Sequence, residues 1–214
     1  MSGKGLKKGV RMSKGQIACR ALENGEVELV KEKGFVGTFK ARDKLLFILG
    51  LRTGARISEL LSLKWDDVLG PDGEVLQEIR FQKRNTKGEI RSRVVPLHPE
   101  AQEAIRAWRE RAEELGLFAP QGPLFASRKK RRALSRQAAW AILKQAYARA
   151  GILGKGRGGT LGTHSLRKTF GTRIYRRFRD IVLAQYALGH RSVENTLRYL
   201  DVRGEEVARA ILTI

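Results

Sequence analysis

The stretch that decides the fold runs from His164-Ser165-Leu166-Arg167 through Leu188-Gly189-His190 to Tyr199. A histidine, an arginine, a second histidine and a tyrosine in this order make chemical sense together if a phosphate is held while a tyrosine hydroxyl attacks it. Far upstream, Thr53-Gly54-Ala55-Arg56 supplies a second arginine that would complete a clamp for the same phosphate. We therefore interpret most of the remaining chain as the scaffold that brings these side chains together.

The composition of the chain points to a polyanionic partner. Its 214 residues suit one compact domain, or one domain with an arm. Lys and Arg number 43 against 22 Asp and Glu, which gives a formal net charge of +21 and a pI near 10.8. Such an excess of like charge destabilises a compact state unless a counter-charge is bound. Nucleic acid is the leading partner, and an anionic membrane surface is the weaker candidate.

Other classes of protein are disfavoured by what the sequence lacks. We find no run of about 20 apolar residues and no signal segment, so we expect no membrane partner. The single cysteine, Cys19, excludes an internal disulfide and fits the reducing environment of the cytoplasm. The three histidines show no metal-ligand spacing with that cysteine, so we expect no metal site and no cofactor.

The N-terminal residues differ in composition from the rest. Residues 1–14 carry five lysines or arginines and no acid, which is typical of a disordered basic tail and also of an arm that follows DNA. We assign residues 1–38 to a basic N-terminal arm that is partly disordered. Residues 39–214 then form one domain that ends in a tail helix at 204–214.

Apolar residues at helical spacing begin near Ala41. Those in 45–51 predict a buried helix that stops at Thr53-Gly54, and a second helix follows. In that second helix Arg56 and Glu59 lie three residues apart, on neighbouring turns. One interpretation is a surface ion pair of little energetic value; the other is a phosphate-binding arginine oriented by a carboxylate. Spacing alone leaves both open.

The middle of the chain predicts a small antiparallel sheet. Residues 75–81 and 91–97 are two strands, and Asn85-Thr86-Lys87-Gly88 between them suits a tight turn. A lysine at such a tip is usually a solvated charge, but it can also deliver a proton to a substrate. Residues 100–115 predict a further helix, closed by Gly116. The fold class is therefore α+β, mainly α: a helical bundle with a small antiparallel sheet.

A dense basic run precedes the next helix. Five cations stand in a row: Arg128, Lys129, Lys130, Arg131 and Arg132. A solvated loop is possible in principle, but we favour contact with the phosphate backbone because so dense a cluster repels itself. We also expect Lys83, Arg84 and Lys168 to contact DNA. Ser135 caps a helix whose apolar face carries Trp140, Leu143 and Tyr147.

The C-terminal third predicts three short helices. Thr163 can cap the first, so that His164 and Arg167 lie in its first turn, where free amides and the helix dipole favour an anion. Asp180 caps the second, which ends at Gly189. Ser192 caps the third, which carries Tyr199. The apolar face of the 204–214 tail docks either on its own subunit or on a neighbour.

These motifs resemble those of the tyrosine recombinase (phage integrase) family. Thr-Gly-Ala-Arg-Ile-Ser-Glu-Leu resembles its first arginine motif, and His-Ser-Leu-Arg its His-x-x-Arg motif. Leu-Gly-His followed by a tyrosine nine positions later resembles the third. The match spans residues 40–201. The resemblance implies the catalytic fold of DNA breaking-rejoining enzymes, with double-stranded DNA as the partner. This sequence departs from the family in one respect: a separate helical clamp domain usually precedes the catalytic one, and we expect the roughly 40 residues before the match to be too few for it.

The resemblance also implies a site and its roles. The implied catalytic set is Arg56, Lys87, His164, Arg167, His190 and Tyr199, supported by Glu59. The arginines and His190 bind the phosphate, His164 is the base, and Lys87, or alternatively Lys83, protonates the leaving 5′ oxygen. Tyr199 becomes joined to a 3′ phosphate. Tyr147 and Tyr186 are predicted to pack in the core, and Tyr175 to face DNA.

The implied function is integration, excision or inversion of DNA by four protomers, from a protein that is a monomer or weak oligomer when free. The implied location is the nucleoid of a prokaryotic cytoplasm, or a viral origin. Two alternatives remain: relaxation of DNA in the manner of a type IB topoisomerase, and DNA binding without catalysis.

Overall fold

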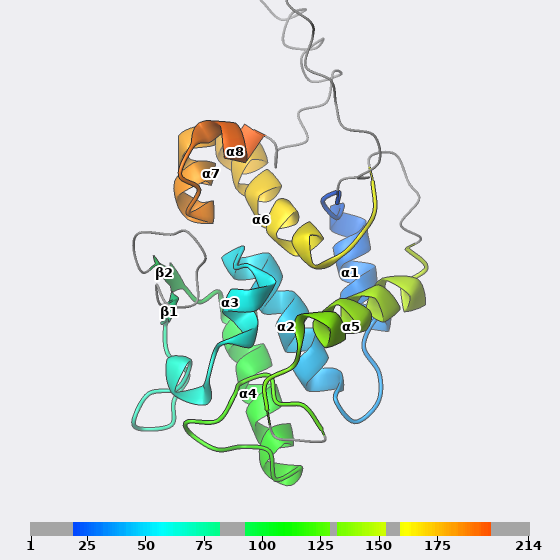
Figure 1. Cartoon of the computed structure of the whole chain (residues 1–214), viewed down its shortest axis with the longest axis vertical. Coiled ribbons are helices and arrows are strands. Elements are labelled where there is room, and N and C mark those ends of the chain that lie inside the picture. The colour runs from blue at the N-terminus through cyan, green and yellow to red at the C-terminus, as the bar shows by residue number, and fades with distance from the viewer. Residues whose placement is uncertain (1–18, 82–92, 129–131, 153–158, 198–214) are drawn as a thin grey trace, which may run out of the picture.

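The computed structural model describes residues 19–81, 93–128, 132–152 and 159–197. This part of the chain is mainly helical with a two-stranded antiparallel sheet, which confirms the predicted fold class (Figure 1). The elements are α1 (Asn24–Lys33), α2 (Lys40–Thr53), α3 (Ile57–Leu61), the 3-10 helix η1 (Trp65–Asp67), β1 (Glu78–Phe81), β2 (Arg93–Pro96), α4 (Pro99–Glu114), α5 (Arg136–Arg149), α6 (Thr163–Phe178), α7 (Ile181–Leu188) and α8 (Val193–Leu197).

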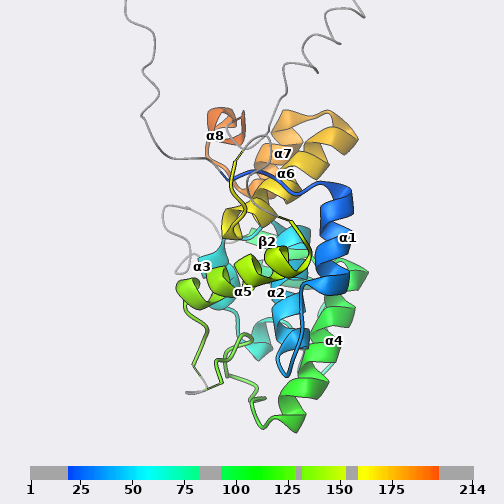
Figure 2. The ribbon, with the colours of Figure 1, turned by 90° about the vertical axis from the view of Figure 1, so that its right-hand side faces the viewer.

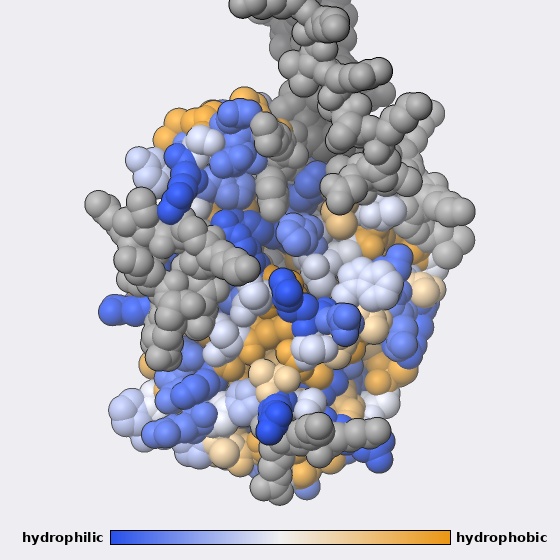
Figure 3. Space-filling model, viewed as in Figure 1, coloured by the Kyte–Doolittle hydropathy of each residue, from blue (hydrophilic) through white to orange (hydrophobic). Residues whose placement is uncertain are grey.

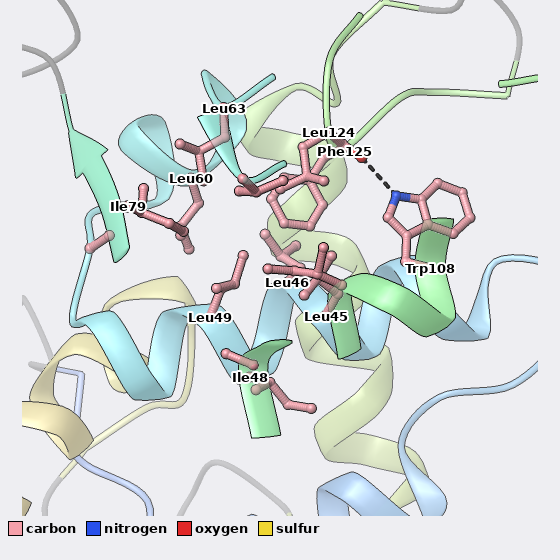
Figure 4. Close-up of a cluster of buried hydrophobic side chains, with 14 of the residues drawn as sticks. Leu45, Leu46, Ile48, Leu49, Leu60, Leu63, Ile79, Trp108, Leu124 and Phe125 are labelled. Carbon is pink, nitrogen blue, oxygen red and sulfur yellow. Dashed lines mark hydrogen bonds between the residues drawn. The ribbon is translucent and has the colours of Figure 1, made fainter. Parts of the chain in front are cut away.

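Helix α2 is the centre of the molecule. It packs against α4, α5 and α6, and Figures 1 and 2 show it surrounded by these helices. Its residues 45–51 are all buried, which is why this segment is apolar on every side rather than along one stripe. Figure 4 shows leucines of α2 meeting side chains from α3, β1 and the loop after α4, where Trp108 Nε1 donates to the Leu124 carbonyl at 2.8 Å.

A second apolar cluster joins α1 to α5 and α6. Val27 and Val30 of α1 are fully buried, together with Phe47, Leu143 and Tyr147. Part of the predicted 1–38 arm is therefore folded onto the domain, and a boundary at residue 38 does not follow the packing. This short helix was not predicted, because Gly25 and Gly34 at its two ends are typical of loops. Residues 1–18 lie outside the described part of the chain.

The sheet is shorter than predicted. β1 and β2 pair antiparallel with Ile79 opposite Val95 and Phe81 opposite Arg93. Residues 75–77 belong instead to the turn that precedes β1, where Val75 bridges Leu69. The tip of the predicted hairpin falls in residues 82–92, outside the described residues.

Most of the predicted helix ends are confirmed. Ser135 Oγ accepts from the Ala138 amide at the start of α5, and Asp180 accepts from two amides of α7. α6 differs by one residue, because Thr163 is already helical and Gly162 is the cap, its amide donating to Ser165 Oγ at 3.1 Å. Trp140 was predicted on the apolar face of α5, but it is 51% exposed because only the opposite side of that helix packs on the core.

Close contacts at glycines draw α2, α6 and α7 together. A Cβ on Gly50 would lie 2.5 Å from Leu166 Cδ1, and one on Gly171 would lie 2.8 Å from Leu188 Cδ1. Helix α6 therefore lies against α2 on one side and α7 on the other, with backbones too close for larger side chains. As a result, the N-terminal turn of α6 lies near the C-terminal ends of both neighbours.

We expect Gly54→Ala to destabilise the fold by about 1–3 kcal/mol, since it combines backbone strain with overpacking. Gly54 has φ of 59°, and a Cβ there would lie 2.3 Å from Phe170 Cδ1. Urea denaturation at pH 7 would measure the change. Gly25→Ala is the matched control, because Gly25 lies in helix α1 with nothing within 4 Å of a new Cβ, so its stability should stay equal or rise. Equal midpoints for both variants would contradict the packing described here.

Candidate active site

Arg167 is buried between two helix ends. It is 2% exposed; its Nη1 donates to the Gly54 carbonyl at 2.5 Å and its Nη2 donates to the Leu188 carbonyl at 2.6 Å. These carbonyls terminate α2 and α7, where main-chain oxygens lack helical partners and carry partial negative charge. Both Nη atoms of Arg167, which we expected to bind the phosphate, thus already donate to main-chain carbonyls. Arg167 brings its positive charge to the site and also joins the two helix ends.

Arg56 is the more accessible guanidinium of the pair. It caps α3, and its side chain is 33% exposed. Glu59 accepts from the Arg56 amide at 2.8 Å with Oε2 and from Arg56 Nη1 at 2.9 Å with Oε1. Because Glu59 is only 1% exposed, this is not a surface ion pair. The geometry favours the second interpretation, in which a buried carboxylate orients the arginine.

His190 is held by its main chain and by its ring. Gly189, with φ of 65°, ends α7 and turns the chain toward the site. The His190 amide donates to the Gln185 carbonyl at 3.0 Å, and Gln185 Nε2 donates to the His190 carbonyl at 3.1 Å. His190 Nδ1 lies 3.0 Å from Oγ1 of the fully buried Thr196 in α8. Gln185 and Thr196 were not predicted from the sequence, because only their positions near the Leu-Gly-His motif indicate that they could support His190.

The two histidines and the two arginines lie close to one another. Arg167 donates to the carbonyls of Gly54 and Leu188, which come two residues before Arg56 and His190 in the sequence. His164 is exposed, yet partial desolvation, and then Arg167 and Arg56, lower its pKa below the ordinary value. Burial, then the same two arginines and Arg93, lower the pKa of His190 to about 4. A guanidinium acts on an imidazole in this way only at short range. The four predicted groups thus lie at the C-terminal ends of α2 and α7 and in the first turns of α6 and α3, and the two arginines favour the neutral form of both rings.

Arg93 belongs to the same site, although no motif pointed to it. From β2 its Nη1 donates to the Thr53 carbonyl at 3.1 Å and to the Ala187 carbonyl at 2.6 Å. Its Nη2 lies 3.8 Å from Glu59 Oε2. The available signal was weak: a cation directly before the apolar residues Val94 and Val95 of a predicted strand that also contains Arg91.

Several predicted residues are not placed in this cluster. Outside the described residues lie Lys83, Arg84, Lys87, Lys129, Lys130, Arg131, Tyr199 and the 204–214 tail. Arg128 and Arg132 are exposed in the loop between α4 and α5, which lies at the end of the molecule opposite α7 and α8 (Figures 1 and 2). Lys168 is half-buried in α6, where it also lowers the pKa of His164.

The burial of the tyrosines agrees with the prediction at Tyr147 but not at Tyr186. Tyr147 is 2% exposed and donates to the Gly162 carbonyl at 3.2 Å, which confirms core packing. Tyr186 was predicted to be buried, and this is wrong: it is 76% exposed, because only one side of α7 packs on α6. Tyr175 is half-buried. Burial therefore excludes Tyr147 as a nucleophile but does not exclude Tyr186.

The surface near the site is largely hydrophilic. In Figure 3 such side chains gather between α7 above and α3 below, and apolar ones lie at the top over α7. Val182, Leu183 and Tyr186 are the exposed apolar residues of that helix. Among the described residues no group of three or more potential metal ligands occurs, and no described helix is long and apolar enough to cross a membrane.

The two depressed pKa values predict loss of stability in acid. In the unfolded chain a histidine takes up its proton near pH 6.5, whereas His190 in the fold does so only near pH 4. Stability is therefore lost as the pH falls through this window, and the contribution is gone below it. We expect His190→Gln to reduce the difference in unfolding free energy between pH 7 and pH 4.5 by on the order of 2 kcal/mol, after allowance for screening. Urea titrations at both pH values would measure it; an unchanged difference would contradict the assignment.

The chain is similar to several known proteins. A family model described as the phage integrase family matches residues 23–206. Tyrosine recombinase XerD of Corynebacterium glutamicum is 33% identical over 166 residues, 78% of this chain and 50% of its own. Type 1 fimbriae regulatory protein FimE of Escherichia coli K12 is 35% identical over 181 residues, 84% of each chain. The site-specific recombinase XerH bound to a palindromic difH substrate superposes with a TM-score of 0.73 at 24% identity, covering 93% of this chain and 53% of that one. The chain thus spans about half of XerD and XerH, and most of FimE.

Proposed function

We propose a reaction from one premise, that this chain belongs to the phage integrase family of tyrosine recombinases. The proposed activity is site-specific recombination, in which DNA strands are cut and rejoined through a covalent 3′-phosphotyrosyl intermediate. The observation that supports it is the proximity of Arg56, Arg167, His164 and His190, since Arg167 of α6 binds the carbonyls two residues before Arg56 and His190 and both arginines depress the pKa of both rings.

In the first step the arginines neutralise the scissile phosphate. Arg56, oriented by Glu59, contacts a non-bridging oxygen, and the buried guanidinium of Arg167 adds positive charge to the site. Attack also places negative charge on the phosphate oxygens, and these fixed donors stabilise it without rearrangement. His190, neutral at pH 7, donates a further hydrogen bond from Nε2.

Proton transfers complete the exchange. His164 is unprotonated at pH 7 because its pKa is depressed, so it can accept the proton of the Tyr199 hydroxyl. The bond from phosphorus to Tyr199 forms while the bond to the 5′ oxygen breaks, and Lys87 gives that oxygen a proton. The phosphotyrosyl bond retains the phosphodiester energy, so a second 5′ hydroxyl can reverse the step without a nucleotide cofactor.

The proposal extends to partners. DNA is the substrate, and the net charge of +21 supports a salt-dependent grip on it, through Lys83, Arg84, Lys168 and the 128–132 run. We propose a homotetramer on two duplexes, with weak association in free solution. The basic N-terminal arm follows the DNA, and the 204–214 tail docks on a neighbour. The nucleoid is the location that this substrate implies.

A nicked suicide duplex tests the proposed function. When the strand downstream of the cut is too short to stay annealed, it diffuses away and the covalent adduct accumulates. DNA flanking the gene is the first substrate to try, and an SDS-resistant band is the readout. Retarded mobility without any adduct would instead indicate binding alone. Relaxation of supercoiled DNA without sequence preference would indicate a topoisomerase.

A further inference from the structure

Two arginines from distant parts of the chain hold the same two helix ends. Arg93 of β2 binds the carbonyls of Thr53 and Ala187, while Arg167 of α6 binds those of Gly54 and Leu188. The four acceptors thus form two consecutive pairs, one at the C-terminal end of α2 and one at that of α7. We call this arrangement the arginine staple.

The staple suits the chemistry of these ends. Carbonyls of a last helical turn lack partners within the helix, and buried ones need a donor from elsewhere. A guanidinium offers several donors in one rigid plane, so one side chain can hold two separate carbonyls. Phe81 lies beneath Arg93, with the guanidinium carbon 5.2 Å from the ring centroid, which fixes the plane of that fork.

The position of Arg93 relates it to the two phosphate-binding groups. Arg56 follows Thr53 by three residues, and His190 follows Ala187 by three residues. Nη2 of Arg93 also lies 3.8 Å from Oε2 of Glu59, the carboxylate that orients Arg56. The Arg93 side chain thus contacts the main chain three residues before Arg56, the main chain three residues before His190, and the carboxylate that orients Arg56. The side chain of Arg93 is only 14% exposed, so this role is internal to the site.

We propose that Arg93 is a positioning residue for strand cleavage, which sets the distance between Arg56 and His190 by stapling Thr53 to Ala187. The inference rests on the proposed function, since it concerns how that site holds a phosphate. Displacing a catalytic group by about 1 Å can cost on the order of 100-fold in rate. Loss of the Arg93 hydrogen bonds should therefore slow the reaction while DNA still binds.

Single-turnover adduct formation on the suicide duplex tests the proposal. We expect Arg93→Lys and Arg93→Gln to lower the rate constant at saturating protein by about 10- to 100-fold, with duplex affinity within about two-fold. Lysine keeps the charge but lacks the planar fork, so it should not restore the rate. Arg80→Gln is the matched control, because Arg80 is an exposed arginine on β1; its rate should equal that of the unaltered protein.

Rate constant and amplitude separate positioning from folding. A variant that is partly unfolded forms less adduct at the normal rate, whereas a mispositioned site forms a normal amount slowly. Reduced amplitude at an unchanged rate constant, or full activity of Arg93→Lys, would overturn the proposal. Absence of adduct with the unaltered protein would overturn the proposed function instead.

A modified leaving group gives a second arm. Sulfur in place of the bridging 5′ oxygen departs as a thiolate, whose conjugate acid has a pKa of about 8.5, and needs no proton donor. We expect this substrate to leave the Arg93→Gln defect in place, since that defect lies in holding the phosphate. Rescue of Arg93→Gln would show that Arg93 acts through protonation of the leaving group, and would overturn the assignment.

Discussion

Tyr199→Phe is expected to abolish adduct formation on the suicide duplex, with a loss of more than about 1,000-fold, because in the proposed reaction its hydroxyl supplies the oxygen that bonds to phosphorus. Affinity for the duplex should change by less than about two-fold, since one hydroxyl among many phosphate contacts is removed. Denaturing electrophoresis of labelled DNA would measure the adduct, and mobility shift in the absence of detergent would measure affinity.

Tyr186→Phe is the control for that experiment. Tyr186 is 76% exposed and therefore also accessible to DNA, so the structure offers it as the rival nucleophile. We expect its variant to form adduct at the unaltered rate. If Tyr186→Phe loses the adduct while Tyr199→Phe keeps it, the nucleophile is misassigned. If neither variant changes any DNA activity, the protein binds DNA without cutting it.

Arg56→Ala is expected to lower the rate of cleavage by about 100- to 1,000-fold, the usual cost of removing one donor that faces developing negative charge. Arg56→Lys should recover little, because an ammonium cannot hold both Glu59 and a phosphate oxygen in one plane. The side chain is 33% exposed, so stability should change much less than rate. Single-turnover kinetics and urea midpoints for both variants would test this pair of effects.

The control for Arg56 is another ion-paired arginine. Arg109 pairs with Glu113, four residues later in α4, at 3.0 Å, and its side chain is 34% exposed, about as much as that of Arg56. Arg109→Ala should leave the cleavage rate unchanged. Equal losses in Arg56→Ala and Arg109→Ala would show that the defect comes from lost positive charge in general rather than from the site.

The sequence predicted local features well. The caps at Ser135 and Asp180 are visible in it because they depend on residues two or three positions away. The convergence of His164 with Arg167 follows from their shared helical turn. Family resemblance supplied the link to Arg56 and His190, which no local rule connects.

Features that depend on tertiary contact escaped prediction. Arg93 reaches carbonyls 40 and 94 residues away, and a carbonyl leaves no mark in the sequence. The exposure of Tyr186 was missed for a related reason, since an apolar helix gives no sign that only one of its sides is covered. The double engagement of Arg167 was missed because its acceptors are also main-chain oxygens.

The arginine staple has a consequence for when cutting becomes possible during synthesis. Its bonds span up to 113 residues, and its last acceptor is Leu188. A nascent chain that stops before Ala187 can form the bonds to Thr53 and Gly54 but not those to α7, and contacts so remote along the chain form late. If the proposed function holds, premature termination products that stop before α7 should therefore bind DNA harmlessly, because the main chain that leads to His190 is missing.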